Sequence, residues 1–350
     1  MDCGQICRSV ARFPGRSAHA VGVRALVGWL SLMNRFARYQ IRQPRGPVVS
    51  LTTHGDRVFT VHLAIESIGR GELRPSRVIL WLDDAATFSN LPVGLRRLQK
   101  RGLEVRLCKN YGPHTKYYPY VAAENLAAEP LVTADDDILY PSYWLKKLVE
   151  AYREFPETVN CYRARVVTVK GRQVMPYYGW TMCTNTESSF RYLATGVSGV
   201  IYAPHFLMDI KAAGEAFEDC CPEADDLWLH VQALRSGLKI RQIGKQAIHF
   251  PIIPGTQKSA LYVGNFRGCD GNDRQIKATY TLEDFNVLLK DSANPHRSAV
   301  GSAMTVGDGG KNANGAGGEA RRDLASVRSS IYAAQVAPDF SITGGGLDGR

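Results

Sequence analysis

Four short runs, three of them mainly apolar and the third along the chain (residues 103–107) alternating between apolar and charged residues, are separated over residues 48–134 by longer segments in which apolar residues recur at helical spacing. Each run is four or five residues long, which is typical of a buried strand. An alternation of strands and helices predicts a parallel sheet with crossover helices. The predicted strands are residues 48–51, 78–82, 103–107 and 131–134, and the predicted helices are residues 59–68, 91–102 and 117–128.

Beyond residue 134 the pattern is less regular but still mixes the two periods. It predicts helices at residues 143–155 and 227–234, and strands at residues 159–169, 173–176, 199–202 and 239–243. Composition then divides the chain into three parts. We expect a basic N-terminal arm (residues 1–45), an α/β domain (residues 46–290) and a Gly-rich tail (residues 291–350), which has too few large apolar residues to form a core and is predicted to be disordered.

The positive charge is concentrated at the N-terminus. Residues 1–55 hold eight arginines, no lysine and one acid, a formal +7 out of +10 for the whole chain. This distribution does not predict a nucleic-acid partner, which would need a basic field over the body. Trp29, Met33 and Phe36 can share one helix face, so the arm is either an amphipathic helix in peripheral contact with an anionic membrane or a basic segment without fixed structure.

Eight cysteines without any C-x-x-C spacing argue against a structural zinc site. Free cysteines behave as small hydrophobes in a core, and this usage predicts a reducing, cytoplasmic setting. No apolar stretch approaches the roughly 20 residues that a membrane-spanning helix needs. The expected location is therefore cytoplasmic, with the arm as the part that would touch the inner face of the plasma membrane.

Three consecutive carboxylates, Asp135, Asp136 and Asp137, follow the fourth predicted strand. Like charges this close oppose one another's ionisation, and a divalent cation removes that conflict. Hard oxygen ligands favour Mg²⁺ or Mn²⁺, which keep open positions for substrate phosphates. For the triplet alone, a solvated acidic turn or a helix N-cap is an equal alternative.

Other polar residues follow the neighbouring strands, and parallel connectivity brings these strand ends to one edge of the sheet. A crevice lined by cations and carboxylates there fits a nucleoside diphosphate ligand. The residues are Thr52, Thr53, His54 and Arg57 after the first strand, Asp83 and Asp84 after the second, and Lys109, His114 and Lys116 after the third.

A second acidic group, Asp225 and Asp226, follows Pro222 at the start of a predicted helix. Acids at this place stabilise the helix dipole, and one of them can also serve as a general base. Tyr177, Tyr178 and Trp180 form an aromatic cluster that can stack on sugars or pack in the core. Phosphate-binding glycine motifs do not compete: the chain lacks G-x-x-x-x-G-K-[ST], and residues 46–290 lack G-x-G-x-x-G.

Five segments together resemble bacterial glycosyltransferases of the GT-A type, family 2-like, over about residues 47–250. The segments are SLTT (50–53), GPHTKY (112–117), TADDDILYP (133–141), GVSGVIY (196–202) and CPEADDLW (221–228). The resemblance implies a Rossmann-like, mostly parallel sheet with helices on both faces and a smaller acceptor-side portion. It also implies a metal on Asp135 and Asp137, with His249 as a late ligand.

The same resemblance implies an acceptor-side loop at Gly196 and Gly199 and a catalytic base in the acidic pair, without choosing between Asp225 and Asp226. The expected donor-site residues are Thr52, Thr53, Arg57, Asp83, Lys116 and Asp136.

The predicted function is a metal-dependent, hexosyltransferase-like glycosyltransferase. It would use Mn²⁺ or Mg²⁺ to move a sugar from a nucleotide-sugar donor to a hydroxyl of a glycan or glycolipid, in cell-surface polysaccharide synthesis. The alternatives are a nucleotidyltransferase and an inactive glycan- or nucleotide-binding protein. A nucleotidyltransferase is disfavoured because no Gly- and Lys/Arg-rich loop follows the first strand.

Overall fold

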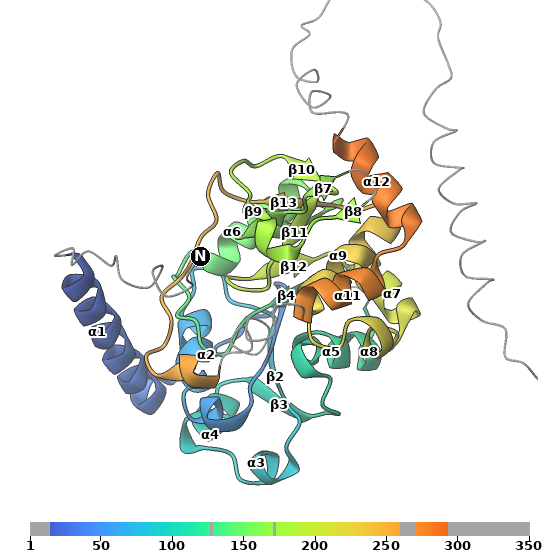
Figure 1. Cartoon of the computed structure of the whole chain (residues 1–350). Coiled ribbons are helices and arrows are strands. Elements are labelled where there is room, and N and C mark those ends of the chain that lie inside the picture. Colours follow the sequence, from blue (N-terminus) through green and yellow to red (C-terminus); the bar gives the residue numbers. More distant parts are fainter. Residues whose placement is uncertain (1–14, 127–128, 171–172, 260–270, 293–350) are drawn as a thin grey trace, which may run out of the picture. The chain divides into compact units, whose positions relative to one another are not determined.

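The computed structural model describes residues 15–126, 129–170, 173–259 and 271–292. Its main sheet has eight strands in the order β10-β13-β5-β12-β4-β1-β2-β3 (Figure 1). Neighbours among β3, β2, β1 and β4 are parallel, β12 runs antiparallel between β4 and β5, and β13 is parallel to β5. The strands are β1 (Val48–Thr52), β2 (Arg77–Leu82), β3 (Leu103–Leu107), β4 (Leu131–Thr133), β5 (Thr158–Cys161), β10 (Ser188–Ser189), β12 (Val200–Tyr202) and β13 (Lys239–Gln242).

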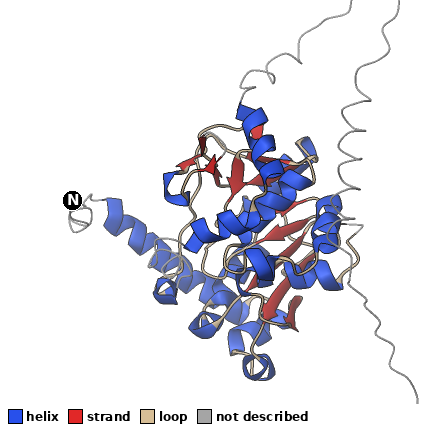
Figure 2. Ribbon diagram, turned by 45° about the vertical axis from the view of Figure 1, so that its right-hand side comes forward, coloured by secondary structure: helices blue, strands red, loops and turns tan. Residues whose placement is uncertain are grey.

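Helices cover both faces of this sheet, because successive strand residues point to opposite sides. Val49 and Val78 pack with α2 (Val61–Gly69), α4 (Val93–Gln99) and α6 (Trp144–Glu154). Val48 and Ile79 pack on the other side with α5 (Tyr118–Ala123), α7 (Pro204–Ala213) and α9 (Asp225–Arg235). The result is a three-layer α/β arrangement (Figure 2), which confirms the predicted fold class.

The predicted elements differ from the observed ones mainly in length. The helix predicted for residues 91–102 ends at Gln99, and Gly102, at φ +98°, turns the chain into β3. The short α3 (Ala85–Ser89) was not predicted; Asp84 caps it by accepting hydrogen bonds from the backbone of Ala86 and Thr87. Within the described residues 117–126, the helix predicted for residues 117–128 corresponds to α5 alone, and a 3₁₀ turn, η2 (Gly112–Lys116), precedes it.

The strand predicted for residues 159–169 is three strands in the structure. β5 belongs to the main sheet, whereas β6 (Ala164–Val166) lies between β11 (Tyr192–Ala194) and β9 (Thr181–Met182) in a separate three-stranded sheet. β7 (Val169–Lys170) then pairs with β8 (Gln173–Val174). Apolar spacing continues through all three strands, so it does not reveal the change of sheet.

The N-terminal arm contains a helix, α1 (Gly15–Phe36), that packs against α2 and α4 (Figure 1). Leu30 is fully buried beside Leu63, and the side-chain amide of Asn34 donates to Glu66 Oε1 at 3.1 Å. Residues 15–36 are therefore a helix that packs on the domain, while its contact with a membrane stays a prediction. Residues 1–14 lie outside the described part. Several large apolar residues of α1 remain exposed: Val21, Trp29, Leu32 and Phe36.

At the other end, α11 (Gly271–Thr279) and α12 (Leu282–Ser292) pack on α9. Asp291, where the tail was expected to begin, is still in α12, and its carboxylate accepts a hydrogen bond from the backbone of Phe190 at 2.8 Å. The rest of the expected tail, residues 293–350, lies outside the described residues.

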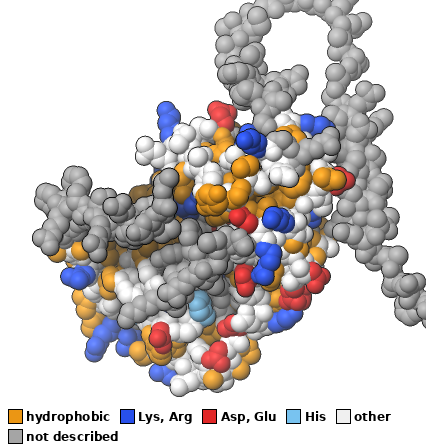
Figure 3. All heavy atoms as spheres, in the orientation of Figure 1, with side chains coloured by type: hydrophobic (Ala, Val, Ile, Leu, Met, Phe, Trp, Pro, Cys, Tyr) orange, Lys and Arg blue, Asp and Glu red, His pale blue; other side chains and the backbone are white. Residues whose placement is uncertain are grey.

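The surface charges, the cysteines and the helix lengths of the described residues can each be compared with what the composition predicted. On the face in Figure 3, acidic and basic side chains of the described residues are interspersed rather than gathered into one basic field. The five cysteines within the described residues are free thiols. No helix in that part of the chain is both long and apolar enough to cross a bilayer.

Candidate active site

The site lies where β4 ends and three other loops meet it. β4 pairs with β1 and is followed by the acidic triplet. The pairing continues one residue beyond β4, because the backbone N–H of Ala134 donates to the carbonyl of Ser50 at 3.0 Å. Ser50 Oγ in turn donates to the carbonyl of Lys116 at 2.7 Å, which fixes η2 against the end of β1. The carboxyl ends of β1 and β4 and the turn after β3 thus meet, as the strand order predicted.

Lys116 connects the triplet to the acidic pair. Its ammonium lies 3.3 Å from Asp135 Oδ1 and 3.3 Å from Asp225 Oδ2. Burial alone would lower the pKa of Lys116, but Asp225, Asp135 and Asp226 raise it well above its usual value. A buried ammonium with this many acidic neighbours stays charged and holds both acidic groups at one place.

The middle carboxylate of the triplet is used within the protein. Asp136 is buried and accepts hydrogen bonds from Thr53 Oγ1 at 2.6 Å and from Arg57 Nη1 at 2.8 Å. Arg57 Nε also donates to the carbonyl of Thr256 at 3.2 Å. Three residues expected to bind substrate therefore bond to one another, and they anchor the loop after β1 beneath the triplet.

The third carboxylate, Asp137, is in a different position. Its backbone carbonyl accepts from Ile253 at 2.7 Å, while its side chain accepts from Gln257 Nε2 at 2.8 Å. Burial and the nearby charge of Asp135 raise the pKa of Asp137 to about 6, although Arg57, 3.5 Å away, opposes this. The repulsion between Asp135 and Asp137 is the conflict that a cation between them would relieve.

A divalent cation on these two carboxylates stays a prediction. Among the described residues no cluster of three His, Cys, Asp or Glu side chains could hold a metal ion by itself. Mg²⁺ sites with one or two carboxylates and several phosphate or water ligands have this composition. If a cation binds here, Asp135 and Asp137 would therefore hold it together with ligands from outside the protein.

The acidic pair occupies the first turn of α9, and its two members have different partners. Asp225 is buried and pairs with Lys116, whereas Asp226 is half-buried and accepts from the backbone N–H of Gly196 at 2.8 Å. Burial and the adjacent charge of Asp225 raise the pKa of Asp226 to about 7, against the opposing effects of Lys116 and the Gly196 hydrogen bond. A carboxylate with a pKa near neutrality is suited to proton transfer.

The glycine loop before β12 is tightly enclosed. A methyl group added at Gly196 would lie 3.1 Å from Lys116 Nζ and 3.2 Å from Asp226 Oδ1. At Gly199, φ is +102° and an added methyl would lie 2.8 Å from the ring of Trp144. Ser198, between them, also has a positive φ of 75° and donates to the carbonyl of Ile248 at 2.7 Å. The sequence GVSG thus lets backbone approach the acidic pair closely.

Several other predicted residues lie away from this centre or have local roles. Thr52 donates to the carbonyl of Trp81 at 3.1 Å, and Asp83 is half-buried after β2. Lys109 is exposed and pairs with Glu215. His114 was expected to line the crevice, but it is buried. Its ring nitrogens lie 2.7 Å from Tyr117 Oη and 2.7 Å from the carbonyl of Cys221, so it connects η2 to the loop before α9.

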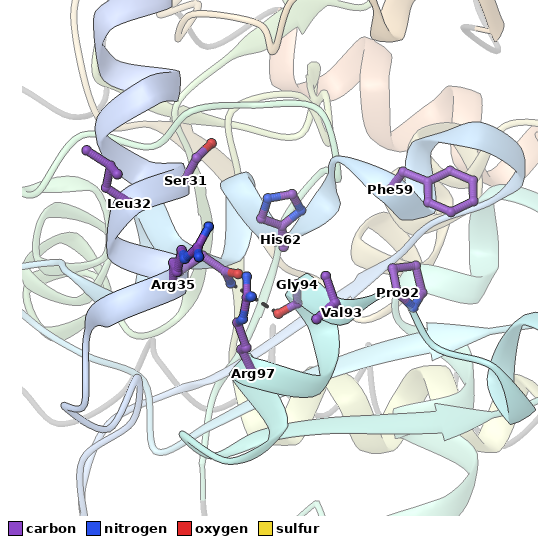
Figure 4. Close-up of a pocket in the computed structure, with 10 residues that line it drawn as sticks. Ser31, Leu32, Arg35, Phe59, His62, Pro92, Val93, Gly94 and Arg97 are labelled. Carbon is purple, nitrogen blue, oxygen red and sulfur yellow. Dashed lines mark hydrogen bonds between the residues drawn. The ribbon is translucent and has the colours of Figure 1, made fainter.

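His249 is exposed and lines a pocket with residues of α1, including Ala20 and Arg24. The acidic triplet does not line this pocket, and the role of His249 as a late metal ligand stays a prediction. A second pocket, of about 500 Å³, lies between α1 and α4 and is likewise separate from the triplet (Figure 4). In the aromatic cluster Trp180 is buried, and Tyr178 is 80% exposed.

Sequence reasoning missed Gln257 and the arginines Arg163 and Arg165. Gln257 contacts Asp137 from a loop with no motif of its own. Arg163 and Arg165 lie on and beside β6, and Asp226 is among the charges that influence the pKa of Arg163. Two arginines at i and i+2 within a predicted strand point to one side, and that spacing was the available signal.

No protein-family model matches this chain, and no curated protein is similar to it in sequence. Among solved structures it is similar to S. aureus TarS 1–349, with 14% identity and a TM-score of 0.40 over 73% of each chain. It is also similar to the mannosyltransferase PcManGT from Pyrobaculum calidifontis in complex with GDP-Man and Mn²⁺ (13% identity, TM-score 0.43, 92% of this chain and 86% of that one). A third is CMP:2-keto-3-deoxy-manno-octonic acid synthetase complexed with CTP (11% identity, TM-score 0.39, 64% and 99%). Similarities this low do not assign the chain to a family.

Proposed function

We propose that this protein is a metal-dependent glycosyltransferase that uses a nucleotide-sugar donor and a hydroxyl acceptor on a glycan or glycolipid. The observation that carries the proposal is the position of Lys116, 3.3 Å from both Asp135 and Asp225. Lys116 thus connects two pairs of carboxylates. Asp135 and Asp137 are suited to a diphosphate-bound cation, and Asp225 and Asp226 are suited to proton transfer. Sugar transfer from a nucleoside diphosphate needs both functions at one centre.

Each residue has a separate task in this proposal. Asp135 and Asp137 would hold Mn²⁺ or Mg²⁺, which supplies positive charge to the diphosphate leaving group. Lys116 keeps Asp135 and Asp225 in place and adds a cation at the same edge of the sheet. Thr53 and Arg57 act indirectly, because they fix Asp136 and with it the backbone of the triplet.

Asp226 is the proposed base, and this is a choice that the sequence left open. Its Oδ1 is held by the N–H of Gly196, so Oδ2 is the oxygen that would accept the proton of the acceptor hydroxyl. That oxygen of the acceptor then bonds to the anomeric carbon of the donor, as the bond from this carbon to the diphosphate breaks. The pKa of Asp226, raised to about 7, gives the carboxylate more basicity than an ordinary aspartate.

We further propose that α1 brings the enzyme to an anionic membrane surface, where a glycolipid acceptor would reside. Leu32 on α1, Phe59 and Val93 are 53%, 62% and 52% exposed and line one pocket together with Arg35 and Arg97 (Figure 4). Exposed apolar side chains beside arginines are the composition of an interfacial surface. The enzyme would then work at the inner face of the plasma membrane, in the synthesis of cell-surface polysaccharide.

Incubation of the full chain with a panel of nucleotide sugars, with Mn²⁺, Mg²⁺ or EDTA, tests the main proposal. We expect release of the nucleoside diphosphate from one donor, dependent on the metal and lost in Asp137→Ala. Pyrophosphate release from nucleoside triphosphates would instead support nucleotidyl transfer. Metal-dependent binding of a nucleotide sugar without any turnover, with every acceptor tried, would support an inactive binding protein.

A further inference from the structure

Two arginines near the proposed base, Arg163 and Arg165, form no salt bridge within the described residues, although Asp226 is among the charges that act on Arg163. Arg163 directly precedes β6, and Arg165 is in it, so the two side chains leave the chain on the same side. Arg163 Nη1 donates to Thr195 Oγ1 at 3.1 Å, and Arg165 Nη1 donates to the carbonyl of Trp180 at 2.9 Å. Both bonds go to neutral groups.

One donor of each side chain is enclosed and unused: within the described residues, Nε of Arg163 and Nε of Arg165 are buried without a hydrogen-bond partner. Burial and the nearby charge of Arg165 lower the pKa of Arg163, against the opposing influence of Tyr177 and Asp226. An arginine stays protonated under such conditions, so the protein holds two like charges together at a cost in stability.

The ring of Tyr177 packs against one member of this pair, Arg165. The guanidinium of Arg165 lies 5.0 Å from the centre of the Tyr177 ring, and the backbone of Tyr177 donates to Asp273 on α11 at 2.7 Å. The charges of Asp226, Arg165 and Arg163 all influence the pKa of Tyr177, which burial raises to about 12. Tyr177 therefore connects Arg165 to α11.

We propose that Arg163 and Arg165 bind an anionic group, a phosphate or a carboxylate, on the acceptor substrate. This rests on the proposed function, because it takes Asp226 as the group that deprotonates the acceptor hydroxyl. The planar guanidinium fork matches both phosphate and carboxylate, and an anion bound at the Nη groups would offset the repulsion between the two arginines. The donor diphosphate is assigned to Asp135, Asp137 and Lys116, which leaves the arginines for the acceptor.

Isothermal calorimetry on the full chain tests this assignment with inorganic phosphate and with acetate as probes. Each titration is made in the absence of other ligands and again after saturation with nucleoside diphosphate and Mn²⁺, which fills the donor site. We expect phosphate or acetate to bind in both conditions, and the stronger of the two identifies the acceptor's anion. Arg163→Gln and Arg165→Gln should each weaken that binding by about tenfold to a hundredfold, the range expected for a hydrogen bond to a charged group.

Arg153→Gln is the matched control, because it removes the same charge from an exposed position on α6 and should change nothing. Arg163→Lys and Arg165→Lys retain the charge but lose the fork; they should bind the anion with intermediate affinity and serve if the Gln variants fail to fold. Equal binding by the wild type, the Gln variants and Arg153→Gln, or no binding by the wild type, overturns the proposal.

The same variants separate this proposal from the glycosyltransferase proposal. Nucleoside diphosphate with Mn²⁺ should bind Arg163→Gln and Arg165→Gln as it binds the wild type. Loss of that binding in the variants would assign the arginines to the donor and overturn the acceptor assignment. If the wild type itself binds no nucleoside diphosphate, the glycosyltransferase proposal fails, while loss of phosphate binding in the Gln variants would still establish an anion site.

Discussion

The ammonium of Lys116 lies 3.3 Å from the carboxylate of Asp225, although the two residues are far apart in the sequence. Lys116 belongs to η2, after β3, and Asp225 begins α9. Asp135 lies at the same distance from Lys116 on another side, so one cation holds two acidic loops together. The arrangement depends on this lysine because both carboxylates are largely enclosed.

Replacement of Lys116 by Met should destabilise the protein by about 3–5 kcal/mol, because it leaves buried carboxylates without their counter-ion. Chemical denaturation followed by circular dichroism measures the change. Lys147→Met removes an exposed lysine that pairs with Glu150 on α6, and its expected cost is within about 0.5 kcal/mol. Equal effects of the two substitutions would show that Lys116 is not a structural counter-ion.

Asp137→Ala should weaken metal-dependent binding of the nucleoside diphosphate by at least roughly tenfold, because a hard cation loses a direct oxygen ligand. Calorimetric titration of the nucleotide with and without Mn²⁺ measures this. Asp84→Ala is a suitable control, since Asp84 follows β2 but only caps α3. Unchanged metal dependence in Asp137→Ala would remove the triplet from the metal site, and the main proposal with it.

Asp226→Asn should lower turnover by roughly 10²–10⁴-fold while donor and metal binding remain nearly unchanged. The amide keeps an oxygen for the Gly196 N–H but cannot accept the acceptor's proton. Asp225→Asn should act mainly through stability, since Asp225 is the partner of Lys116. If both amide variants keep the wild-type rate, the acidic pair only stabilises the start of α9.

The pH profile gives the same prediction an independent readout. Because the pKa of Asp226 is raised to about 7, the fraction of base in its active, deprotonated form should rise with pH through that value. We expect kcat/KM to fall about tenfold per pH unit on the acid side of this raised pKa and to level off on the alkaline side. A flat profile between pH 5 and 8 would contradict the assignment of Asp226.

Leu32→Ser and Phe36→Ser, combined, should reduce binding to vesicles that contain anionic lipid, because they remove exposed apolar side chains from α1. Co-sedimentation at low and high salt measures this, and binding should fall as salt screens the arginines. Met208→Ser changes an exposed apolar residue on α7 and is the control. Equal sedimentation of all three proteins would refute a role for α1.

Removal of residues 296–350 should leave turnover and stability unchanged, since their Gly-rich composition predicts no core. Removal from residue 291 onward should cost about 1–3 kcal/mol, because the Asp291 carboxylate accepts the N–H of Phe190 and pairs with Lys239. Thermal melting and transfer assays on both truncations check this. A large loss of turnover in the shorter deletion, with a folded body, would give the tail a catalytic role.

The strands around the site could be read from the sequence because burial repeats locally. Val48, Val49 and Leu51 are apolar and residues 48–51 are all buried, which is typical of a strand that is covered on both faces. The same local rule placed the triplet at the end of β4 and the acidic pair at the start of α9. It also identified α9 through its apolar face.

Only the tertiary structure decided which charges meet. Lys116 and Lys109 look alike in sequence, yet Lys116 is enclosed between carboxylates and Lys109 is exposed beside Glu215. Likewise, Asp225 and Asp226 are adjacent, but they have different partners. Asp225 pairs with Lys116, and Asp226 accepts a hydrogen bond from Gly196. Hydrophobic periodicity reports whether a residue faces the core, whereas the partner of a buried charge depends on which distant loops pack together.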